Sequence, residues 1–573
     1  MNRNIMKTKD IFIKDSVDSF PAKNSGAEII KSQDELTRSP LTEYVLRHKD
    51  MILIVILFLL ALALRIYSFR FVDVIPTDGT SYVETARAIG RGEIDGLGVY
   101  GFYPALIWVV NSFISDGELS ARIVSLLFGS MLVVPLYLLG KEIFSRSVAV
   151  SACLVAIVWP PLVNSSCQVL TQSTHTTLQL TGVYFVWRAF KGYRISDGYL
   201  AGVFFGLTFL TRPEGILLFF MTPIAFFYYR FKEIVKKPVF LWAYSGSFFV
   251  FFAINLLLVH HVTGDWQLSA KTDSALNDAL SYYLDIPDLN YIVGYEPKGY
   301  LDIMREYPGF IWKNSFQNIL KAWETIIPAP FWMFCAAGFF SGGYSSERNI
   351  IRFFLVSTAA PIAVLIVFYY ISTGYVEAYL PVIFLWTASG FFVVETWLKR
   401  SVAGFLSPVQ NQAFGRTPVL IASSVIYSTI IFAPQIRKDI SDAEYKVEMD
   451  NGRRAEKFIG HILKESLPPG KIMTRWARIA FYSERDWVNI PLGVDYDGII
   501  KAAYDNGVRF LIIDNMLYDN RPALGMELFE PFGDVALQGE FFNKDPAARV
   551  KGLRPFFGYK DQRDVGVIVY ELP

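Results

Sequence analysis

The stretch that decides how this sequence is interpreted is VIPTDGTSYVETARAIGRGE, Val74–Glu93. It follows the first long apolar run almost immediately, so we expect it to lie at a membrane surface. The pattern predicts a short amphipathic helix, and Asp78 stands where that helix would begin. The reason for an acid here depends on which side of the membrane the stretch faces.

The composition is typical of a polytopic membrane protein. Of the 573 residues, 53% are hydrophobic and only 19% are charged, whereas soluble domains carry about 25% charged residues. The net charge of +1 gives no electrostatic case for binding nucleic acid. Cys153, Cys167 and Cys335 show neither metal-ligand nor disulfide spacing, and we interpret them as small core residues.

Apolar runs long enough to cross a membrane recur along the chain. The region 198–229 has two short runs on either side of TRPEG. We interpret it as two short spans that meet near the outer face, with a re-entrant hairpin as the alternative. Because a span needs roughly 20 apolar residues, we predict the others near 51–69, 121–140, 147–163, 175–190, 238–259, 353–371, 379–397 and 418–435, with a shorter one near 326–341. The total is about eleven.

Basic residues orient these spans. RHK precedes the first span, and the turns that the count places inside are all basic, so the N-terminal segment 1–50 is predicted to be cytoplasmic. The run FYPALIWVVNSFI, 102–114, would reverse the arrangement if it crossed the membrane. At about 13 residues it is too short, and we interpret it as an interfacial helix. The membrane domain 51–436 then has external loops 70–120 and 260–325. The first apolar run lacks a cleavage-like site and is expected to remain as an anchor.

The tail, 437–573, is predicted to be a soluble external domain. Strand-like runs (KIMTRW, WVNIP, RFLIID, VGVIVYEL) alternate with helix-like runs (ARIAFYSER, YDGIIKAAYDNGV), which predicts a small α/β sandwich. It shows no Gly-rich phosphate loop and no nucleophile–base set. Asp514, at the end of RFLIID, is either a catalytic acid or a turn residue, and we favour the turn. We expect this domain to shape or cap the external site.

The loop 260–325 contains a second surface element. The run GFIWKNSFQNILKAW has an apolar helical face, which predicts a helix lying on the bilayer. The residues of that face are Trp312, Phe316, Ile319, Leu320 and Trp323.

Several motifs match a known family in order and membrane placement. They are Asp78, Gly79 and Tyr82 followed by ETARAIGRGE, then FYPALIWVVNSF, Glu118 with Arg122, LTRPEG (210–215), YLPVIFLWTASG (379–390) and LPPGKIMTRWARIAFYSERDW. In these motifs the chain, from about residue 45 to 573, resembles the GT-C membrane glycosyltransferases. Within these, it resembles specifically the protein O-mannosyltransferase and aminoarabinose-transferase type (glycosyltransferase families 39 and 83).

The resemblance implies a fold and a reaction. The fold is a polytopic α-helical membrane protein of GT-C type with a C-terminal extracytoplasmic α/β domain, located in the cytoplasmic (inner) membrane. A sugar on a polyprenyl phosphate is transferred, with inversion, to a hydroxyl of a lipid, glycan or protein on the outer side. Such chemistry needs a base for the hydroxyl and cations for the departing phosphate. The resemblance makes Asp78 that base.

From the residues alone, Asp78 has a second interpretation. It could cap the predicted helix by accepting backbone N–H bonds, and Ser81 with Glu84 could form a capping box. The resemblance favours catalysis, and one carboxylate could serve both purposes.

The sequence departs from the family pattern at three positions. Gly79 stands where the family has a Glu, and Gln172 stands where relatives often have a second acid. Because hard cations bind charged oxygens, these losses argue against a divalent-metal site, although the family leaves such a metal open. Ala378 replaces an Arg that many relatives place before the YLP motif, so the cation for the donor phosphate must come from elsewhere.

Four cations are candidates for that role: Arg122, Arg212, Lys271 and Arg305. Arg122 could instead pair with Glu118 one helical turn earlier. Arg212 lies at a helix interruption at membrane depth, where a charge is usually functional, but it could also pair with Glu214. Lys271 and Arg305 are loop residues, for which simple solvation is the alternative.

Six further residues complete the predicted site. His260 and His261 end a span, and adjacent helical positions diverge by about 100°, so we favour an interfacial role over shared metal binding. The residues predicted to contact substrate are Tyr82, Tyr103, His260, His261, Glu377 and Tyr379.

Three other functions remain open from the sequence. One is a transferase that uses a diphosphate-linked glycan, as oligosaccharyltransferases and O-antigen ligases do, although the tryptophan-tryptophan-aspartate signature of the former is absent. Another is a transporter or flippase, which usually shows internal repeats that we do not find. The third is a relative that binds lipid-linked sugar without catalysis.

Overall fold

The computed structural model describes most of the chain in two compact units, Met1–Ile56 and Leu57–Pro573. The described part of the first unit is the beginning of helix α2 (Pro40–Phe69), which continues into the second. The described residues are 40–270, 272–286, 298–326, 329–341, 345–368, 373–403, 456–491, 493–514, 521–528, 550–560 and 566–573.

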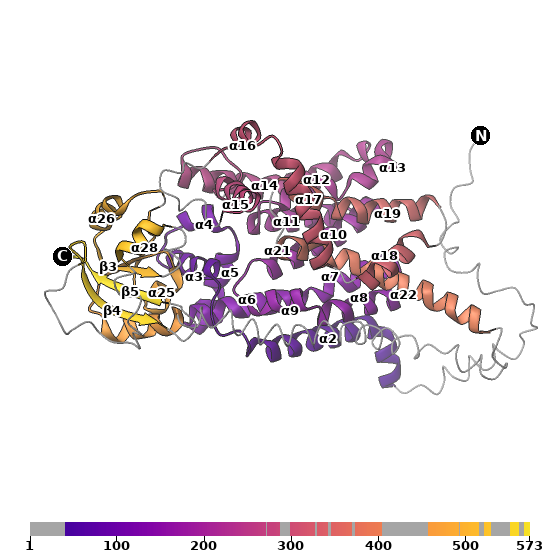
Figure 1. Ribbon diagram of the computed structural model, residues 1–573. Helices are drawn as coiled ribbons and strands as arrows, with labels where there is room; N and C mark the ends of the chain where they lie inside the picture. The colour runs from indigo at the N-terminus through magenta and orange to yellow at the C-terminus, as the bar shows by residue number, and fades with distance from the viewer. Residues whose placement is uncertain are drawn as a thin grey trace, which may run out of the picture. The chain divides into compact units, whose positions relative to one another are not determined.

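The part of the second unit before residue 404 is helical (Figure 1). Its helices up to residue 263 are α3 (Thr77–Gly90), α4 (Asp95–Tyr100), α5 (Tyr103–Ile114), α6 (Gly117–Met131), α7 (Val133–Ile143), α8 (Arg146–Val158), α9 (Pro160–Cys167), α10 (Gln172–Gly192), α11 (Ile195–Thr211), α12 (Gly215–Met221), α13 (Ile224–Val235) and α14 (Pro238–Thr263). They are followed by α15 (Thr272–Leu284), α16 (Tyr300–Glu306), α17 (Phe310–Ile326), α18 (Ala329–Phe340), α19 (Ser346–Ala359), α20 (Pro361–Phe368), α21 (Thr373–Val376), the 3-10 turn η2 (Glu377–Tyr379) and α22 (Leu380–Ala403).

Several described helices are long and apolar enough to cross a membrane. Five pass by length and composition, and a sixth does if α8 and α9, bent by 58° at Pro160, form one span. The five are His48–Phe69, Gly117–Ile143, Pro238–Thr263, Ser346–Val367 and Gly374–Trp397. The span predicted near 418–435 lies outside the described residues. Helix α10, predicted as a span, is not in this set, and its first turns carry the polar run STHTT.

The region around TRPEG differs from its prediction. The first apolar run forms one helix, α11, as expected, but the second does not form a single helix. It ends as α12 at Met221 and restarts as α13 at Ile224, because Pro223 interrupts the run. The predicted helices over 78–93 and 102–114 are confirmed as α3 and α5.

Helix α17 confirms the predicted amphipathic pattern. Trp312, Phe316, Ile319 and Leu320 are all exposed large hydrophobic residues on it. An apolar face of this kind suits contact with the acyl region of a membrane.

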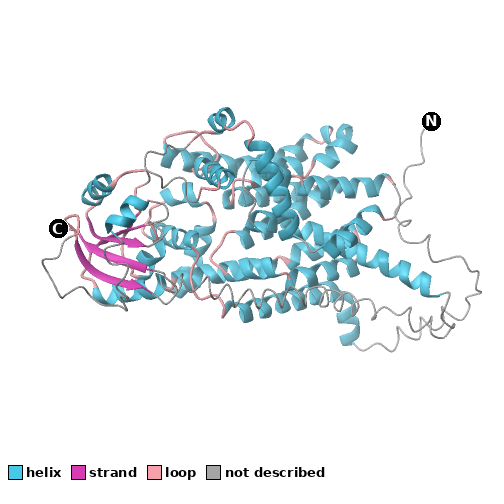
Figure 2. Ribbon diagram, in the orientation of Figure 1, coloured by secondary structure: helices cyan, strands magenta, loops and turns pink. Residues whose placement is uncertain are grey.

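The C-terminal part contains a five-stranded mixed sheet (Figure 2). The strand order is β2-β1-β3-β5-β4, in which β1 is parallel to β2 and β3, and β5 is antiparallel to β3 and β4. The strands are β1 (Lys471–Thr474), β2 (Trp487–Val488), β3 (Val508–Asp514), β4 (Arg554–Lys560) and β5 (Gly566–Glu571), and the named helices are α25 (Ala477–Tyr482), α26 (Tyr496–Asp505) and α28 (Pro522–Leu528).

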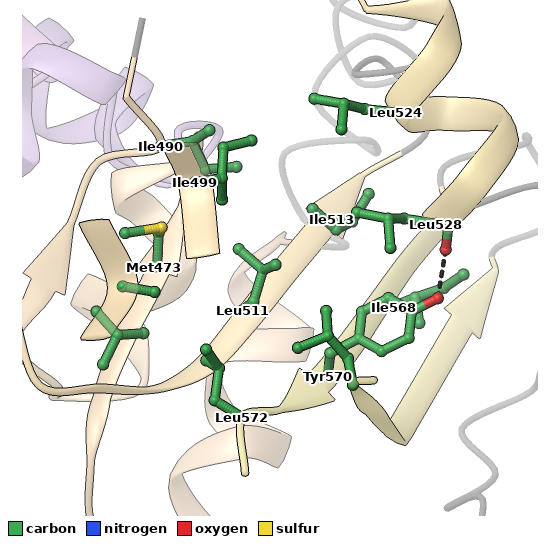
Figure 3. Packing of buried hydrophobic residues seen from close by; sticks show 13 residues of the cluster. Met473, Ile490, Ile499, Leu511, Ile513, Leu524, Leu528, Ile568, Tyr570 and Leu572 are labelled. Carbon is green, nitrogen blue, oxygen red and sulfur yellow. Dashed lines mark hydrogen bonds between the residues drawn. The ribbon is translucent and has the colours of Figure 1, made fainter. Parts of the chain in front are cut away.

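Alternate residues of the central strands build a core on each face of this sheet. Leu511 and Ile513 of β3 pack with Ile568 and Tyr570 of β5 in one cluster (Figure 3). Phe510 and its alternate neighbours form a cluster on the other face. The strands predicted from KIMTRW, WVNIP, RFLIID and VGVIVYEL and the two predicted helices are all present, whereas β4 and α28 were not predicted.

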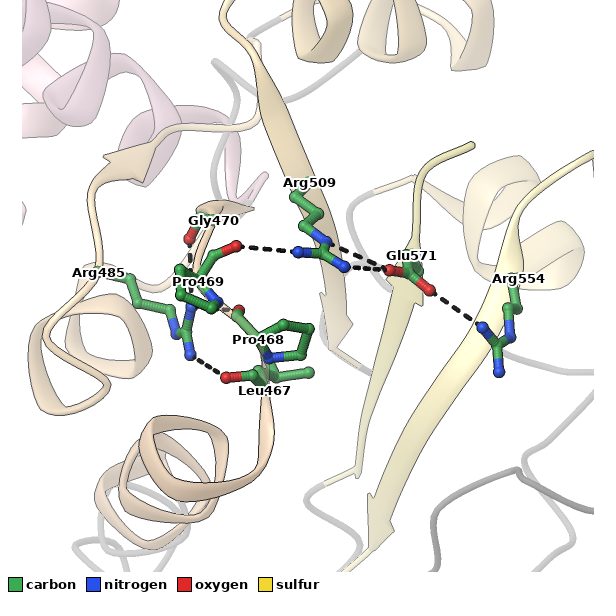
Figure 4. A network of polar contacts seen from close by, with 8 residues as sticks. All are labelled: Leu467, Pro468, Pro469, Gly470, Arg485, Arg509, Arg554 and Glu571. Carbon is green, nitrogen blue, oxygen red and sulfur yellow. Dashed lines mark hydrogen bonds and ion pairs between the residues drawn. The ribbon is translucent and has the colours of Figure 1, made fainter.

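Hydrogen bonds between charged side chains link three strands at one end of the sheet (Figure 4). Glu571 of β5 accepts hydrogen bonds from Arg509 of β3 and from Arg554 of β4, at 3.0 and 3.3 Å. Arg485 donates to backbone carbonyls, including that of Leu467 at 2.6 Å. Asp514, at the end of β3, is buried and lies 3.5 Å from Arg475. Asp514 therefore belongs to a buried ion pair, which the sequence analysis did not suggest.

Candidate active site

Asp78 lies in the first turn of α3, which begins at Thr77. The N-cap is Pro76 and no side chain caps the helix, so the interpretation of Asp78 as a cap is wrong. The predicted capping box is wrong too, because Ser81 lies inside the helix. The Asp78 side chain is exposed, and within the described part it accepts no hydrogen bond and forms no ion pair. The helix dipole favours an anion here, and the carboxylate is available to a ligand.

Tyr82 lies one turn after Asp78 and is buried. Its ring packs edge-on against Tyr100 and Tyr103, with centroids 5.7 and 5.3 Å away. Burial raises the pKa of the Tyr82 hydroxyl above its usual value, and the negative charge of Asp78 raises it further, while the Arg212 cation acts in the opposite direction. The Tyr82 hydroxyl is therefore close enough to both charged groups to respond to each of them.

Arg212 lies where the TRPEG motif ends helix α11. The residue before a proline is restricted to extended backbone, and Arg212 has φ −151° and ψ 131°. Its Nε donates to Glu214 Oε1 at 2.5 Å, and its guanidinium lies over the Tyr375 ring, 4.8 Å from the centroid. The predicted ion pair between Arg212 and Glu214 is therefore present.

The loop between α4 and α5 is hydrogen-bonded to the end of α11. The Phe102 backbone N–H donates to the Leu210 carbonyl at 2.8 Å. Gly101 has φ +73°, and a Cβ there would lie 2.0 Å from the same carbonyl oxygen. Only glycine satisfies both the backbone angle and this approach. This hydrogen bond holds Leu210, two residues before Arg212, against the loop before α5.

The YLP motif begins in the turn η2. Glu377 is buried and accepts a hydrogen bond from the Ser165 hydroxyl. The Ala378 carbonyl accepts from Gln179 Nε2 at 3.1 Å. Tyr379 is 1% exposed. The residues predicted from this motif therefore lie inside the helical domain and not on its surface.

Buried polar atoms near this turn that have no hydrogen-bond partner in the described part of the chain include Gln172 Oε1, His175 Nε2, Gln179 Oε1 and the Tyr379 hydroxyl. The charges of Arg212 and Glu214 act on both His175 and Tyr379, so these two side chains lie near that ion pair. Buried polar groups normally have partners. Their convergence suits a polar ligand that supplies the missing hydrogen bonds.

A buried arginine that the sequence reasoning missed lies in the first apolar run. Arg65, 1% exposed, donates from Nε to the Ser166 hydroxyl at 3.1 Å. The hydroxyls of Ser166, Ser173 and Ser165 are linked at 3.3 and 3.4 Å, and Ser165 donates to Glu377. This chain connects α2 with the YLP motif. A charge inside a span is the signal that could have found it.

Arg122 and Tyr103 also have protein partners. Arg122 is buried, with Nη2 2.5 Å from Glu118 Oε1 and Nη1 donating to the Val72 carbonyl at 2.6 Å. The Tyr103 hydroxyl lies 2.6 Å from that of Ser125. For Arg122 the predicted helix-surface ion pair is present, and binding of a phosphate stays a prediction.

The remaining predicted residues are dispersed. His260 stacks on Trp266 with centroids 4.2 Å apart, while His261 Nε2 lies 3.2 Å from Asp95 Oδ1. Arg305 is exposed and lies 3.9 Å from its neighbour Asp302. Lys271 lies outside the described residues. The two histidines thus have different partners, as their divergence on the helix predicted.

The packing around Gly79 explains the first departure from the family pattern. Gly79 is buried, and a Cβ there would lie 2.7 Å from Ile75 Cγ1 and 3.0 Å from the Val169 carbonyl oxygen. A glutamate side chain cannot be placed in that space. In the described part of the chain no three His, Cys, Asp or Glu residues are grouped as metal ligands. The residues present do not fit a divalent cation.

Known proteins resemble this chain in one family model and in their fold. Residues 102–258 match the family model of dolichyl-phosphate-mannose-protein mannosyltransferase. The fold is similar to ArnT from Cupriavidus metallidurans bound to undecaprenyl phosphate, with a TM-score of 0.53 and 13% identity over 90% of this chain and 97% of that one. A search of curated protein sequences finds no match.

A second group of solved structures has the same fold. The Archaeoglobus fulgidus oligosaccharyltransferase in the apo form matches with a TM-score of 0.50 and 14% identity, over 86% of this chain and 73% of that one. The same enzyme, AglB, in complex with an inhibitory peptide and a dolichol-phosphate also has a TM-score of 0.50 and 14% identity, over 87% and 73%. These solved structures therefore share their fold with this chain, and the match to the mannosyltransferase family model is confined to residues 102–258.

Gly79→Ala should destabilise the protein. The added methyl group has no space between Ile75 and Val169, and overpacking of this kind typically costs about 1–3 kcal/mol. We expect a lower thermal unfolding midpoint of the purified protein in detergent. Gly90→Ala, at the other end of α3, is the control, because its Cβ would meet nothing closer than 3.6 Å. An equal midpoint for both variants would contradict the packing account.

Proposed function

We propose that the protein is an inverting glycosyltransferase that moves a sugar from a polyprenyl phosphate to an acceptor hydroxyl on the extracytoplasmic side of the membrane. The observation that carries the proposal is the exposed, unbonded carboxylate of Asp78 near Tyr82 and Arg212. The match to a structure bound to undecaprenyl phosphate supports a lipid-phosphate donor. The proposal includes about eleven spans, an outward-facing site and an external C-terminal domain, as the positive-inside rule predicts.

The residues suggest how such a transfer proceeds. The Asp78 carboxylate takes the proton of the acceptor hydroxyl as the acceptor oxygen forms a bond to the anomeric carbon. The bond between that carbon and the phosphate oxygen breaks on the opposite face, which inverts the centre. The polyprenyl phosphate leaves with the bonding electron pair, and the Arg212 cation stabilises its charge. The buried groups of Gln172, His175 and Tyr379 are available to hydrogen-bond the sugar or the phosphate.

Asp78→Asn should abolish most of the transfer. General base catalysis contributes typically about 10²–10⁴-fold, so we expect at least a hundredfold lower rate. Purified protein would be given radiolabelled polyprenyl-phosphate monosaccharides and envelope extract, and labelled product would be counted. Glu84→Gln is the matched control, because it changes an exposed carboxylate on the same helix. Transfer by Asp78→Asn at the wild-type rate would assign the base to another residue.

Arg212→Lys should weaken donor binding while keeping the positive charge. Lysine cannot reproduce the planar guanidinium that contacts both Glu214 and the Tyr375 ring. We expect about tenfold or more weaker binding of polyprenyl phosphate, since a hydrogen bond to a charged group is worth about 1.5–3 kcal/mol. Arg188→Lys is the control, because Arg188 also pairs with a carboxylate, that of Asp197 at 3.2 Å. Equal affinity in both variants would leave Arg212 a structural partner of Glu214.

A second candidate function rests on the oligosaccharyltransferase matches. It is transfer of a glycan from a diphosphate-linked lipid, with the same carboxylate as base. The same assay with diphosphate-linked donors distinguishes the two. Product formed only with those donors would replace the first proposal, and lipid binding without product from any donor would indicate a non-catalytic relative.

A further inference from the structure

The segment that leads into Asp78 is bonded to the C-terminal part of the chain. Lys457 Nζ donates to the Asp73 carbonyl at 2.9 Å and lies 3.2 Å from its carboxylate. The Ile75 backbone N–H donates to the Tyr482 hydroxyl at 3.0 Å. Arg478 Nη1 donates to the Thr77 hydroxyl at 2.8 Å. Asp73, Ile75 and Thr77 are alternate residues, and each bonds a residue about 400 positions later in the chain.

Apolar contacts accompany these bonds. Phe481 and Tyr482 of α25 are buried in one cluster with Ile75, Tyr82 and Val83. A cation reinforces it, because the Arg87 guanidinium lies 5.2 Å from the centre of the Phe481 ring. Helix α25 therefore packs on the same turns of α3 that carry Asp78 and Tyr82.

The donor to Thr77 is itself held rigidly. Arg478 forms two hydrogen bonds to the Glu456 carboxylate, at 2.6 and 2.8 Å, and both side chains are buried. Two bonds to one carboxylate fix the plane of the guanidinium. Its remaining Nη1 can thus place the Thr77 hydroxyl accurately. By contrast, α3 has no side-chain cap of its own, so its first turn depends on partners from elsewhere.

From these contacts we propose that α25 acts as a clamp that positions the Asp78 carboxylate for catalysis, with Thr77, Arg478 and Tyr482 as positioning residues. This inference rests on the proposed function. None of the three side chains needs to touch substrate. They hold the backbone on the N-terminal side of Asp78, and a general base must be held within hydrogen-bond reach of its proton. The C-terminal domain then serves the reaction by fixing a residue of the membrane domain.

Two substitutions each remove one hydrogen bond of the clamp and leave the buried ion pair between Arg478 and Glu456 intact. Thr77→Val removes the acceptor for Arg478 but keeps the shape, and Tyr482→Phe removes the acceptor for the Ile75 N–H but keeps the ring. Because small misplacements of reacting groups lower rates strongly, we expect each variant to lower kcat about tenfold while KM for the donor is unchanged. Thr77→Ser keeps the hydroxyl and should restore most of the rate.

Hydrogen–deuterium exchange of the full-length protein gives a readout that is independent of activity. The amides of residues 74–80 should exchange about tenfold faster in Thr77→Val and in Tyr482→Phe than in the wild type. Arg509→Gln is the control, because Arg509 belongs to the network of Figure 4, in the same domain, and bonds Glu571 instead of the lead-in segment. That variant should change neither exchange over 74–80 nor kcat.

The outcomes separate this proposal from the proposed function. If Asp78→Asn is inactive while Thr77→Val and Tyr482→Phe keep the wild-type kcat, the clamp is overturned and the glycosyltransferase proposal stands. Faster exchange with an unchanged kcat likewise overturns the positioning role. If the wild type transfers no sugar from any donor, the function fails. In that case, the clamp is overturned as well if the amides of residues 74–80 exchange at the wild-type rate in Thr77→Val and Tyr482→Phe.

Discussion

The interaction on which the site depends is the buried ion pair between Arg212 and Glu214. A charge removed from water is tolerated only when a partner compensates it, and here the partner lies two residues away across Pro213. The proline ends α11 and forces Arg212 into extended backbone, so the same short motif breaks the helix, turns the cation inward and supplies its counter-ion. The docking of Gly101 on the Leu210 carbonyl then fixes this turn against the region of α3.

Around this pair, the helical domain places polar side chains at a depth where they need partners. The serine hydroxyls between Arg65 and Glu377 link two further buried ionisable side chains through small groups that fit between packed helices. Small hydroxyl residues allow close helix approach and still form hydrogen bonds. Unlike this closed chain, the polar atoms of His175 and Tyr379 have no partner in the described residues. The serine network is therefore satisfied internally, whereas the atoms of His175 and Tyr379 are open to further hydrogen bonds.

Much of the fold follows from local sequence patterns, but the assembly of the site does not. Amphipathic periodicity predicted α3, the length of an apolar run predicted α5, and short apolar runs predicted the central strands, which are buried on both faces. Strand β4 was missed because its sequence, RPFFGYK, begins with arginine and proline and contains a glycine, all poor strand signals. Arg65 was missed because hydropathy averaged over the first apolar run is dominated by the apolar residues around it. The cap interpretation of Asp78 failed because α3 begins one residue earlier, at Thr77, and the contacts that hold this turn come from residues about 400 positions away.

Gly79 shows how one close contact can change the chemistry that a site can perform. By the family resemblance an acid follows the aspartate at this position, and this chain carries a glycine there. Here the same position is closed by Ile75 and by the Val169 backbone, and Gln172 carries an amide where a second acid would stand. In the reaction that we propose, arginine then supplies the cationic charge for the departing phosphate. The same close contact joins the first turn of α3 to the segment before α10, so Gly79 is a packing position beside Asp78.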